Sequence, residues 1–349
     1  MRKDSVLELK NDVLKSLWAQ SAKYLSTSTQ TQSVASSNVE SRLAVGYSRS
    51  ARGAYKLELR VQRRDGPAFD LAQQFKKKAR QEANIEVVPS IEIPSRIAVL
   101  DVSGDESLTK EERPLHIGLS IGHTSDGAGT LGAFVIDTNS DVGVLSNTHV
   151  LAPMGTSKLG DRIYQPGRPD KRLVGKREIG TLENFCVITK DDRDSIDAAV
   201  ATLDDNIEQQ SNRIPKGFPM QGKMIQQVKA PDDLLEFLSK DLTVCKIGRS
   251  TGFTTGRIGA VAVDNVIVKT SIGNVIFDNV IEINWESNRR PFSRPGDSGS
   301  MVFTKKGLWA IGLHFAGGEK TIKGNKKVGV SYSCNMATVL ETLEISLLD

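Results

Sequence analysis

Apolar residues at helical spacing open the chain, and a polar stretch follows them. Ser5 and Glu8 form a capping box ahead of the apolar positions, so we expect one amphipathic helix over residues 5–25. Its apolar positions are Val6, Leu9, Val13, Leu14, Leu17, Trp18 and Leu25. From Ser26 to Asn38 nearly every residue is polar, and too few apolar groups remain to offset chain entropy. Residues 1–38 are therefore interpreted as a helix and a polar linker.

Residues 39–114 mix strand-like and helical patterns. A helical run extends from Phe69 to about Gln81, and the polar, acidic stretch Asp101–Pro114 makes a boundary. Four short apolar runs predict strands: Leu43–Tyr47, Leu57–Val61, Ile85–Val88 and Ile97–Leu100. We interpret this segment as a small α/β module. It carries no recognisable chemistry, so residues 1–114 are either a stabilising appendage or a surface for a regulatory partner.

From residue 115 the pattern changes to short β-type runs separated by glycines, which is typical of a barrel or sandwich. The proline-containing connection 206–240 divides this region into 115–205 and 241–349. Residues 336–347 return to helical spacing and predict a C-terminal helix. The strand-like runs are Leu131–Ile136, Val142–Leu145, Ala198–Leu203, Leu242–Ile247, Val261–Val268, Val275–Ile283, Met301–Thr304 and Leu308–Phe315.

Charge and cysteine content narrow the class of protein. The formal net charge of +4 is spread along 349 residues, and short basic runs such as Lys76–Lys78 lack interleaved aromatic residues, so we expect no nucleic-acid binding. The three cysteines lie far apart with no metal spacing, which favours a reducing compartment and no cofactor. Charged residues interrupt the first 20 positions, and no run of about 18 apolar residues occurs. We therefore expect a cytoplasmic protein with no membrane association.

The sharpest local string is Arg294–Ser300, which reads Arg-Pro-Gly-Asp-Ser-Gly-Ser between two strand-like runs. A serine hydroxyl attacks a carbonyl only when a base removes its proton and donors await the oxyanion. Glycines at 296 and 299 permit a tight loop in which the amides of Gly296 and Ser298 supply such donors. Ser298 is thus a candidate nucleophile, although the same string is also common in ordinary surface turns.

A base and an orienting acid are available upstream. His149 ends an apolar run, and an imidazole titrates in the range that a general base needs at neutral pH. Asp197 directly precedes a small, apolar strand-like run, unlike the more polar surroundings of Asp191 and Asp192. A buried carboxylate beside the ring would hold its tautomer. Each residue taken alone has a structural explanation, and the three strings together favour a triad.

Ser-Asn-Thr-His-Val (146–150) and Gly-Asp-Ser-Gly-Ser (296–300) resemble the histidine and serine motifs of trypsin- and chymotrypsin-like serine peptidases. Over residues 115–349 the chain is most similar to intracellular trypsin-like peptidases of bacteria and their plant relatives, which also carry the pattern found at Gly248–Gly256. The resemblance implies a mainly β fold with two antiparallel six-stranded barrels. It implies that His149 is the base, Asp197 its orienter and Ser298 the nucleophile, with an oxyanion hole from Gly296 and Ser298.

The same resemblance raises two questions of detail. Asp297 needs a cationic partner, for which we expect Arg249, Arg294 or an N-terminus produced by processing upstream of residue 118. The substrate wall is expected at His314, Phe315 and Ala316, with Phe292 near the base of the pocket. A histidine there suggests an acidic or amide side chain before the scissile bond. Phe292 disfavours Lys or Arg.

Other functions compete with this interpretation. An α/β-hydrolase needs its acid and histidine after the serine, and only His314 follows Ser298, too closely for the intervening elements. No Walker loop or dinucleotide fingerprint is present. The remaining alternative is a catalytically silent scaffold with a peptidase fold. The sequence therefore predicts a serine endopeptidase acting on protein or peptide substrates.

Overall fold

The computed structural model describes residues 1–27, 43–50, 52–80, 82–93, 106–125, 127–153, 157–170, 177–190, 193, 196–227, 234–238, 241–322 and 325–349. This part of the chain is mainly β, with two sheets, an N-terminal helix and a C-terminal helix, which confirms that much of the prediction. The predicted linker beyond residue 27 and the predicted strand Ile97–Leu100 lie outside the described residues.

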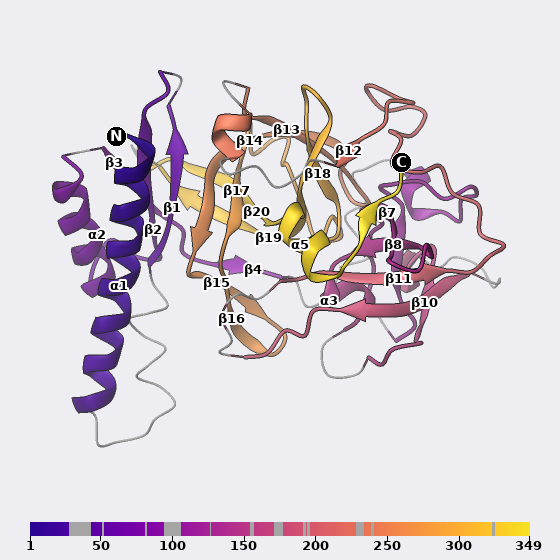
Figure 1. Cartoon of the computed structure of the whole chain (residues 1–349), viewed down its shortest axis with the longest axis horizontal. Helices are drawn as coiled ribbons and strands as arrows, with labels where there is room; N and C mark the ends of the chain where they lie inside the picture. Colours follow the sequence, from indigo (N-terminus) through magenta and orange to yellow (C-terminus); the bar gives the residue numbers. More distant parts are fainter. Residues whose placement is uncertain are drawn as a thin grey trace.

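The N-terminal elements form a layer at one end of the molecule (Figure 1). In it, β1 and β2 are antiparallel, while β2 and β3 are parallel. The apolar stripe of α1 is covered here, because Val13 and Leu17 are buried in one cluster with Leu57 and Leu59. The elements are α1 (Lys3–Thr27), β1 (Leu43–Arg49), β2 (Tyr55–Val61), α2 (Pro67–Lys78) and β3 (Ala83–Val87).

The first half of the remaining chain, with β21 from the C-terminal end, builds an eight-stranded sheet in the order β21-β7-β8-β11-β10-β9-β5-β6. β6 and β7 are joined through Leu131 and Gly132, and Leu131 exchanges backbone hydrogen bonds of 2.8 Å with Gly118 and Leu119. The path of pairing therefore closes on itself. The strands are β5 (Ser120–His123), β6 (Gly129–Thr130), β7 (Ala133–Ile136), β8 (Val142–Ser146), β9 (Arg162–Tyr164), β10 (Glu178–Phe185), β11 (Ala199–Leu203) and β21 (Ser346–Leu347).

The second half contains a ring of six antiparallel pairings, in the order β13-β14-β17-β20-β19-β18 and back to β13. β1 adds the N-terminal strands to this sheet by pairing with β14. The strands of the ring are β13 (Thr243–Gly248), β14 (Gly252–Asp264), β17 (Val280–Trp285), β18 (Met301–Thr304), β19 (Trp309–Thr321) and β20 (Lys327–Asn335).

Two predicted strands are each divided by an asparagine. Val261–Val268 was expected to be continuous, but Asn265 has a φ of 60° and separates β14 from β15 (Val266–Thr270). Val275–Ile283 is likewise divided at Asn279, whose φ is 54°, into β16 (Gly273–Phe277) and β17. Asparagine tolerates the left-handed conformation that such turns need. The prediction of continuous strands was wrong at both places, and β15 and β16 form a hairpin instead.

The chain ends are also more segmented than expected. The C-terminal helix α5 spans Met336–Thr342, shorter than the predicted 336–347, because Glu344 adopts a φ of 55° and the chain continues as β21. The helix of the N-terminal layer, α2, ends at Lys78, three residues before the predicted end. Short elements complete the described chain: β4 (Ile91–Glu92), η3 (Glu106–Thr109), α3 (Thr148–Leu151), η4 (Arg168–Asp170), β12 (Gln226–Gln227) and α4 (Leu234–Phe237).

A buried ionic cluster joins the N-terminal layer to the second sheet. Glu282 of β17 is fully buried and accepts hydrogen bonds from Arg60 of β2 at 2.7 and 2.9 Å. Lys320 and Tyr332 donate to the same carboxylate at 2.9 and 3.0 Å. Burial alone would raise the pKa of Glu282, but the two cations hold it far below its usual range. Glu282 therefore stays ionised and links four strands, β2, β17, β19 and β20.

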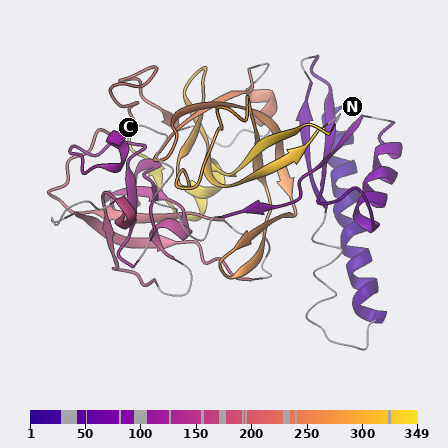
Figure 2. The ribbon, with the colours of Figure 1, turned by 180° about the vertical axis from the view of Figure 1, so that it is seen from behind.

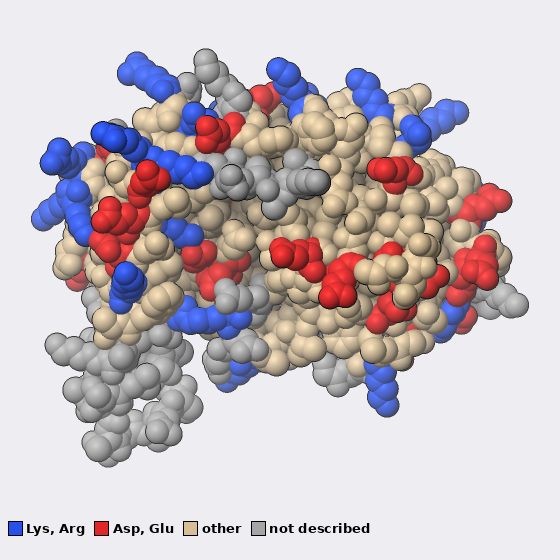
Figure 3. Space-filling view, in the orientation of Figure 1, with Lys and Arg blue, Asp and Glu red and all other residues tan. Residues whose placement is uncertain are grey.

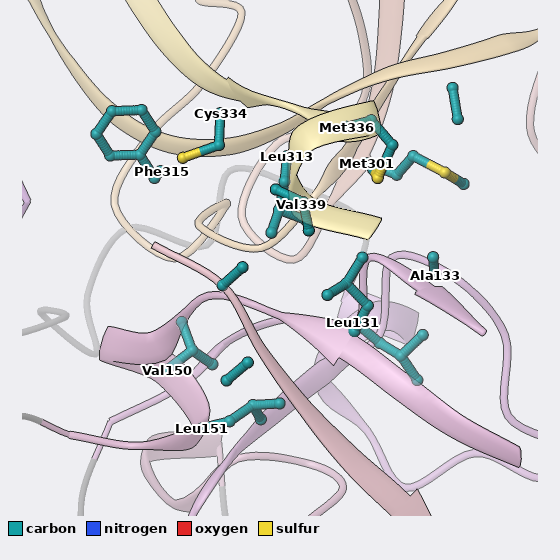
Figure 4. Packing of buried hydrophobic residues seen from close by; sticks show 14 of the residues in the cluster. Leu131, Ala133, Val150, Leu151, Met301, Leu313, Phe315, Cys334, Met336 and Val339 are labelled. Carbon is teal, nitrogen blue, oxygen red and sulfur yellow. The ribbon is translucent and has the colours of Figure 1, made fainter. Parts of the chain in front are cut away.

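The two halves of the molecule share one hydrophobic cluster. Leu131, Val150 and Leu151 of the first half face Leu313 and Val339 of the second (Figure 4). On the face shown in Figure 3, Lys and Arg stand mostly along the upper edge and the left, and a row of Asp and Glu crosses the lower right half. No helix in the described part of the chain is long and apolar enough to cross a membrane.

Candidate active site

His149 and Asp197 are in direct contact. The ring Nδ1 of His149 donates to Asp197 Oδ2 at 2.5 Å, and the backbone N–H of His149 donates to Asp197 Oδ1 at 3.1 Å. Asp197 is fully buried, whereas the His149 side chain is 15% exposed. Because Nδ1 carries the proton in this bond, Nε2 is the ring nitrogen left to accept one.

The pairing of two neighbouring strands explains this contact. Ser146 at the end of β8 lies opposite Ala199 at the start of β11, so the residues just beyond these strand ends meet. The Asn147 side chain donates to the Asp197 carbonyl at 2.5 Å, and Thr148 Oγ1 donates to the Ala198 carbonyl at 2.8 Å. The polar residues of the histidine motif thus hold the segment that carries the acid.

Ser298 lies in the loop Arg294–Ser300, the serine loop, which leads into β18 and is hydrogen-bonded to the first sheet. Thr130 makes two of the contacts: its N–H donates to the Ser298 carbonyl at 2.8 Å, and its hydroxyl donates to the Gly296 carbonyl at 2.9 Å. A Cβ placed on Gly129 would lie 2.4 Å from Val150 and 2.8 Å from the Ser298 carbonyl. This glycine therefore lets the serine loop approach the helix of His149.

Within the described residues, the Ser298 hydroxyl makes no hydrogen bond, and none joins it to His149. Ser298 is only 6% exposed. The structure thus brings together His149 with Asp197, and places the Ser298 loop against the same helix without a serine–histidine hydrogen bond. Such bonds are often long in structures without substrate and tighten when substrate binds.

Some backbone N–H groups of the serine loop donate to an acceptor, and others do not. Asp297, Gly299 and Ser300 donate to the carbonyls of Arg294, His314 and Asp297 at 2.8–3.0 Å. Within the described chain, the amides of Gly296 and Ser298 have no such acceptor. Gly296 has a φ of 97°, and a Cβ there would lie 2.3 Å from Ser250 Oγ. Only glycine fits this position, since a side chain would meet both backbone strain and a clash.

The partner of Asp297 is Lys246, which the sequence analysis did not select. Lys246 Nζ donates to Asp297 Oδ2 at 3.0 Å, and both side chains are completely buried. Burial would raise the pKa of Asp297, but the charge of Lys246 and the Thr251 hydroxyl lower it below its usual value. The expectation of Arg249 or Arg294 was wrong. Arg249 pairs with Asp170, and Arg294 donates to Asp297 only through its backbone N–H.

The Gly248–Gly256 stretch, whose pattern is part of the family resemblance, makes hydrogen bonds to the serine loop. The N–H groups of Ser250 and Thr251 donate to Asp297 Oδ1 at 2.9 and 3.1 Å, and Thr251 Oγ1 donates to Oδ2 at 2.7 Å. The Ser250 hydroxyl donates to the Pro295 carbonyl at 2.6 Å. The sequence signal for this support was present in the motif, but its role became visible only in the fold.

His314 lies in β19 beside the serine loop and is buried. Its Nδ1 donates to the Tyr332 carbonyl at 3.1 Å, because a carbonyl can only accept. Burial, followed by the nearby charge of Lys246, lowers the pKa of His314 to about 3. The neutral ring therefore offers Nε2 as an acceptor, and Nε2 has no partner among the described residues.

The other three predicted wall residues point their side chains into the core. Phe292 is fully buried and packs edge-on to His314 at a centroid distance of 6.4 Å. Phe315 is also fully buried and packs on Phe277 at 4.5 Å. Ala316 is 2% exposed and lies opposite Tyr332 of β20. Their side chains therefore face the core, and contact of these residues with a substrate stays a prediction.

Two hydroxyl groups that were not predicted from the sequence lie at Gly317, three positions after His314 in β19, since Ser331 of β20 is opposite Gly317. The side-chain oxygens of Ser293 and Ser331 are 2.7 Å apart, and Trp285 donates to Ser331 at 2.7 Å. A Cβ on Gly317 would lie 3.6 Å from Ser293 Oγ, an ordinary van der Waals distance, so Gly317 is a direct neighbour of this hydroxyl. The separation of these residues in the sequence hid their common position.

No metal site accompanies these groups in the described part of the chain, where no three His, Cys, Asp or Glu residues cluster. The cysteines Cys186, Cys245 and Cys334 are all free thiols. Burial raises the pKa of each of them, to about 11 for Cys186 and about 12 for Cys245. These thiols are therefore poor nucleophiles at neutral pH.

No family model matches this sequence, and no curated protein matches it. Among solved structures, the chain is similar to a Nocardiopsis protease (NAPase), with 17% identity and a TM-score of 0.43 over 67% of this chain and 98% of that one. It is also similar to a Cellulomonas bogoriensis chymotrypsin, with 16% identity and a TM-score of 0.42 over 67% of this chain and 97% of that one. At such values, neither similarity identifies what this chain does.

Proposed function

We propose that the protein is a serine endopeptidase with His149, Asp197 and Ser298 as its catalytic triad. The observation that carries the proposal is the contact of His149 with a fully buried Asp197. His149 belongs to α3, and the Ser298 loop lies close to this helix. A buried carboxylate that fixes the tautomer of a partly exposed imidazole is the arrangement that activates a serine hydroxyl.

The fold supports the same proposal. The closed pairing path of the first sheet and the ring of six pairings in the second are taken as the two barrels of a chymotrypsin-like fold. His149 and Asp197 belong to the first, and Ser298 to the second. The three proposed residues thus come from both sides of the boundary at which the two halves share their hydrophobic cluster, which supports the proposal. Residues 1–93 are taken as an addition to the second barrel through β1.

In the proposed reaction, Ser298 Oγ bonds to the carbonyl carbon of the substrate while His149 Nε2 takes the hydroxyl proton. The carbonyl electron pair moves onto oxygen, where the unengaged amides of Gly296 and Ser298 stabilise the negative charge. The C=O bond then re-forms, the C–N bond breaks, and His149 returns its proton to the leaving nitrogen. Water repeats the sequence on the ester, releasing the acid and restoring Ser298.

We further propose that the residue before the scissile bond has an amide side chain. The neutral His314 can accept a hydrogen bond at Nε2, and an amide N–H donates one, whereas a carboxylate at neutral pH cannot. Ser293 and Ser331 add hydroxyl groups that serve as donors or acceptors. Of the acidic and amide residues expected from the sequence, this favours glutamine or asparagine.

A fluorophosphonate probe tests the proposal against a silent scaffold. Such a probe reacts with an activated serine without needing the correct peptide sequence. We expect covalent labelling of the wild type at Ser298, located by peptide mass mapping, and none of Ser298→Ala or His149→Ala. The surface variant Asp205→Asn is the matched control and should label like wild type. A folded wild-type protein that never labels would support the scaffold.

A further inference from the structure

One edge of β19 carries several partners in succession. β20 pairs with β19 along the whole of Gly312–Thr321 and so occupies one edge. Any other strand that pairs within Gly312–Thr321 must then lie on the opposite edge. There β18 pairs as far as Leu313, and the backbone of Gly299–Ser300 continues the contact at His314. Further along the same edge, β4 pairs with Gly317–Gly318. β4 therefore follows the serine loop on a shared strand edge.

Between these two contacts, Phe315 and Ala316 have no strand partner on this edge within the described residues. β4 is antiparallel to β19, with Ile91 opposite Gly318 and Glu92 opposite Gly317. Its chain direction therefore points toward Ala316 and the serine loop. Figure 1 shows β4 leading from the N-terminal strands toward the half that holds α3, and Figure 2 shows the same course from behind.

Residues 91–93 are hydrogen-bonded to a neighbouring strand on each side. Ile91 and Ile93 are 9% and 6% exposed, whereas Glu92 between them is exposed. Ile93 N–H donates to the Lys269 carbonyl of β15 at 3.0 Å, so the segment lies between β15 and β19. A Cβ on Gly318 would lie 2.3 Å from the Ser90 carbonyl, which shows how closely the two backbones approach.

We propose, on the basis of the proposed peptidase function, that residues 91–93 occupy in cis the strand edge on which the acyl side of a substrate pairs. Addition of an extended peptide to a free strand edge is a common mode of peptide recognition. A substrate that pairs antiparallel to β19 and reaches Ser298 must run over Gly317–Gly318 in the direction that β4 now takes. The chain thus carries its own competitor, which a substrate must displace.

The side chains of residues 91–93 also indicate which peptides this edge of β19 would bind. The side chains of Ile91 and Ile93 enter the shared hydrophobic cluster, and Glu92 points to solvent beside Lys269, at 3.9 Å between charged atoms. Alternate residues of a strand face the same side. The substrate class is therefore an extended peptide with apolar residues two positions apart and a variable residue between them.

Peptide binding tests this inference without any turnover. The probe is a fluorescent peptide of residues 88–93, Val-Pro-Ser-Ile-Glu-Ile, and its binding is followed by anisotropy. Proline at position 92 removes an N–H from a strand paired on both sides and should release β4. Because the Glu92 side chain is exposed, Glu92→Pro removes no buried side chain, and only the docking of Ile91 and Ile93 is lost. We expect the peptide to bind Glu92→Pro at least about tenfold more tightly than wild type, since the competing state is depopulated.

The control peptide carries serine in place of both isoleucines and should bind neither protein. A second variant, Ile91→Ser/Ile93→Ser, weakens docking through the side chains and should behave like Glu92→Pro, which separates release of β4 from an effect of proline itself. Circular dichroism checks that both variants are folded. Equal affinity of the isoleucine peptide for wild type and both folded variants, or no binding to any of them, would overturn the inference.

The same variants distinguish this inference from the proposed function. Fluorophosphonate is small and does not need the edge of β19, so labelling at Ser298 should be equal in wild type and Glu92→Pro. Tighter peptide binding without labelling in any protein would support the occupied edge and contradict the peptidase. Equal labelling with unchanged peptide affinity would contradict only the occupied edge.

Discussion

Lys246 and Asp297 form a completely buried ion pair, with 3.0 Å between Nζ and Oδ2, directly beneath the loop that carries Ser298. Asp297 also accepts hydrogen bonds from the backbone of Ser250, Thr251 and Arg294. An internal lysine therefore supplies the positive charge that this aspartate needs, and no new N-terminus is required at this position.

Replacing this lysine should disorder the serine loop. Lys246→Met leaves the Asp297 carboxylate buried without its cation, which costs about 3–5 kcal/mol when a buried pair is broken. We expect a matching loss in the free energy of unfolding, measured by urea titration, and a fall in kcat/KM. Lys306→Met removes an exposed lysine that is remote from β4 in the sheet pairing and is the control. Wild-type stability and activity in Lys246→Met would show that the pair does not support the loop.

The ionic cluster around Glu282 gives a second stability prediction. Arg60→Met removes the bidentate partner of a fully buried carboxylate and should destabilise the protein by about 3–5 kcal/mol. Arg63→Met, three residues away, breaks only an exposed pair with Asp65 and should change stability by less than about 0.5 kcal/mol. Urea unfolding measures both, and equal effects of the two variants would contradict the role of the cluster.

His314 predicts a pH dependence of stability. Its pKa is about 3 in the folded chain, below the ordinary value of 6.5, so the unfolded chain binds the proton more readily. Its contribution is complete above pH 6.5 and is lost as the pH falls from 6.5 toward 3. His314→Gln should therefore lose less stability than wild type between pH 7 and pH 5 in urea unfolding. Parallel losses in the two proteins would show that His314 is not buried in its neutral form.

Specificity provides a fourth prediction. Peptides that differ only in the residue before the scissile bond should be cleaved fastest with glutamine or asparagine, more slowly with glutamate and slowest with lysine. Neutral His314 presents an acceptor at Nε2 for an amide N–H, whereas the nearby charge of Lys246 and the apolar ring of Phe292 disfavour a cationic side chain. Initial rates of product formation measure kcat/KM for each peptide. A profile led by lysine or arginine would exclude this description of the pocket.

Periodicity located many elements because it reflects burial directly. The runs at 131–136, 142–145 and 301–304 alternate or cluster apolar residues, and each contains a strand. β20 was missed since its sequence Lys-Val-Gly-Val-Ser-Tyr-Ser-Cys-Asn carries serines on the side that faces Ser293. β10 was missed because Gly180 and Glu183 interrupt its apolar pattern. Polar residues at a site thus conceal the strands that build it.

The site was only partly accessible to sequence reasoning for a similar reason. Local motifs identify the histidine and serine segments, because their loops need particular residues at adjacent positions. Lys246 looks like an ordinary lysine within an apolar strand, and its partner is 51 positions away. A lysine in such a run is a signal of a buried partner, but the pattern does not say which acid it meets. Residues 91–93 were invisible as a strand, since they form one only by pairing with β15 and β19.

The most direct test of the central claim compares peptide hydrolysis by wild type and Ser298→Ala. Products from a peptide library are identified by mass spectrometry, and single-turnover rates are measured on the best substrate. The triad predicts cleavage by wild type and a fall in kcat of about a millionfold in Ser298→Ala, with the same circular dichroism spectrum. Equal cleavage by both proteins, or none by a wild type that binds peptides, would contradict the account.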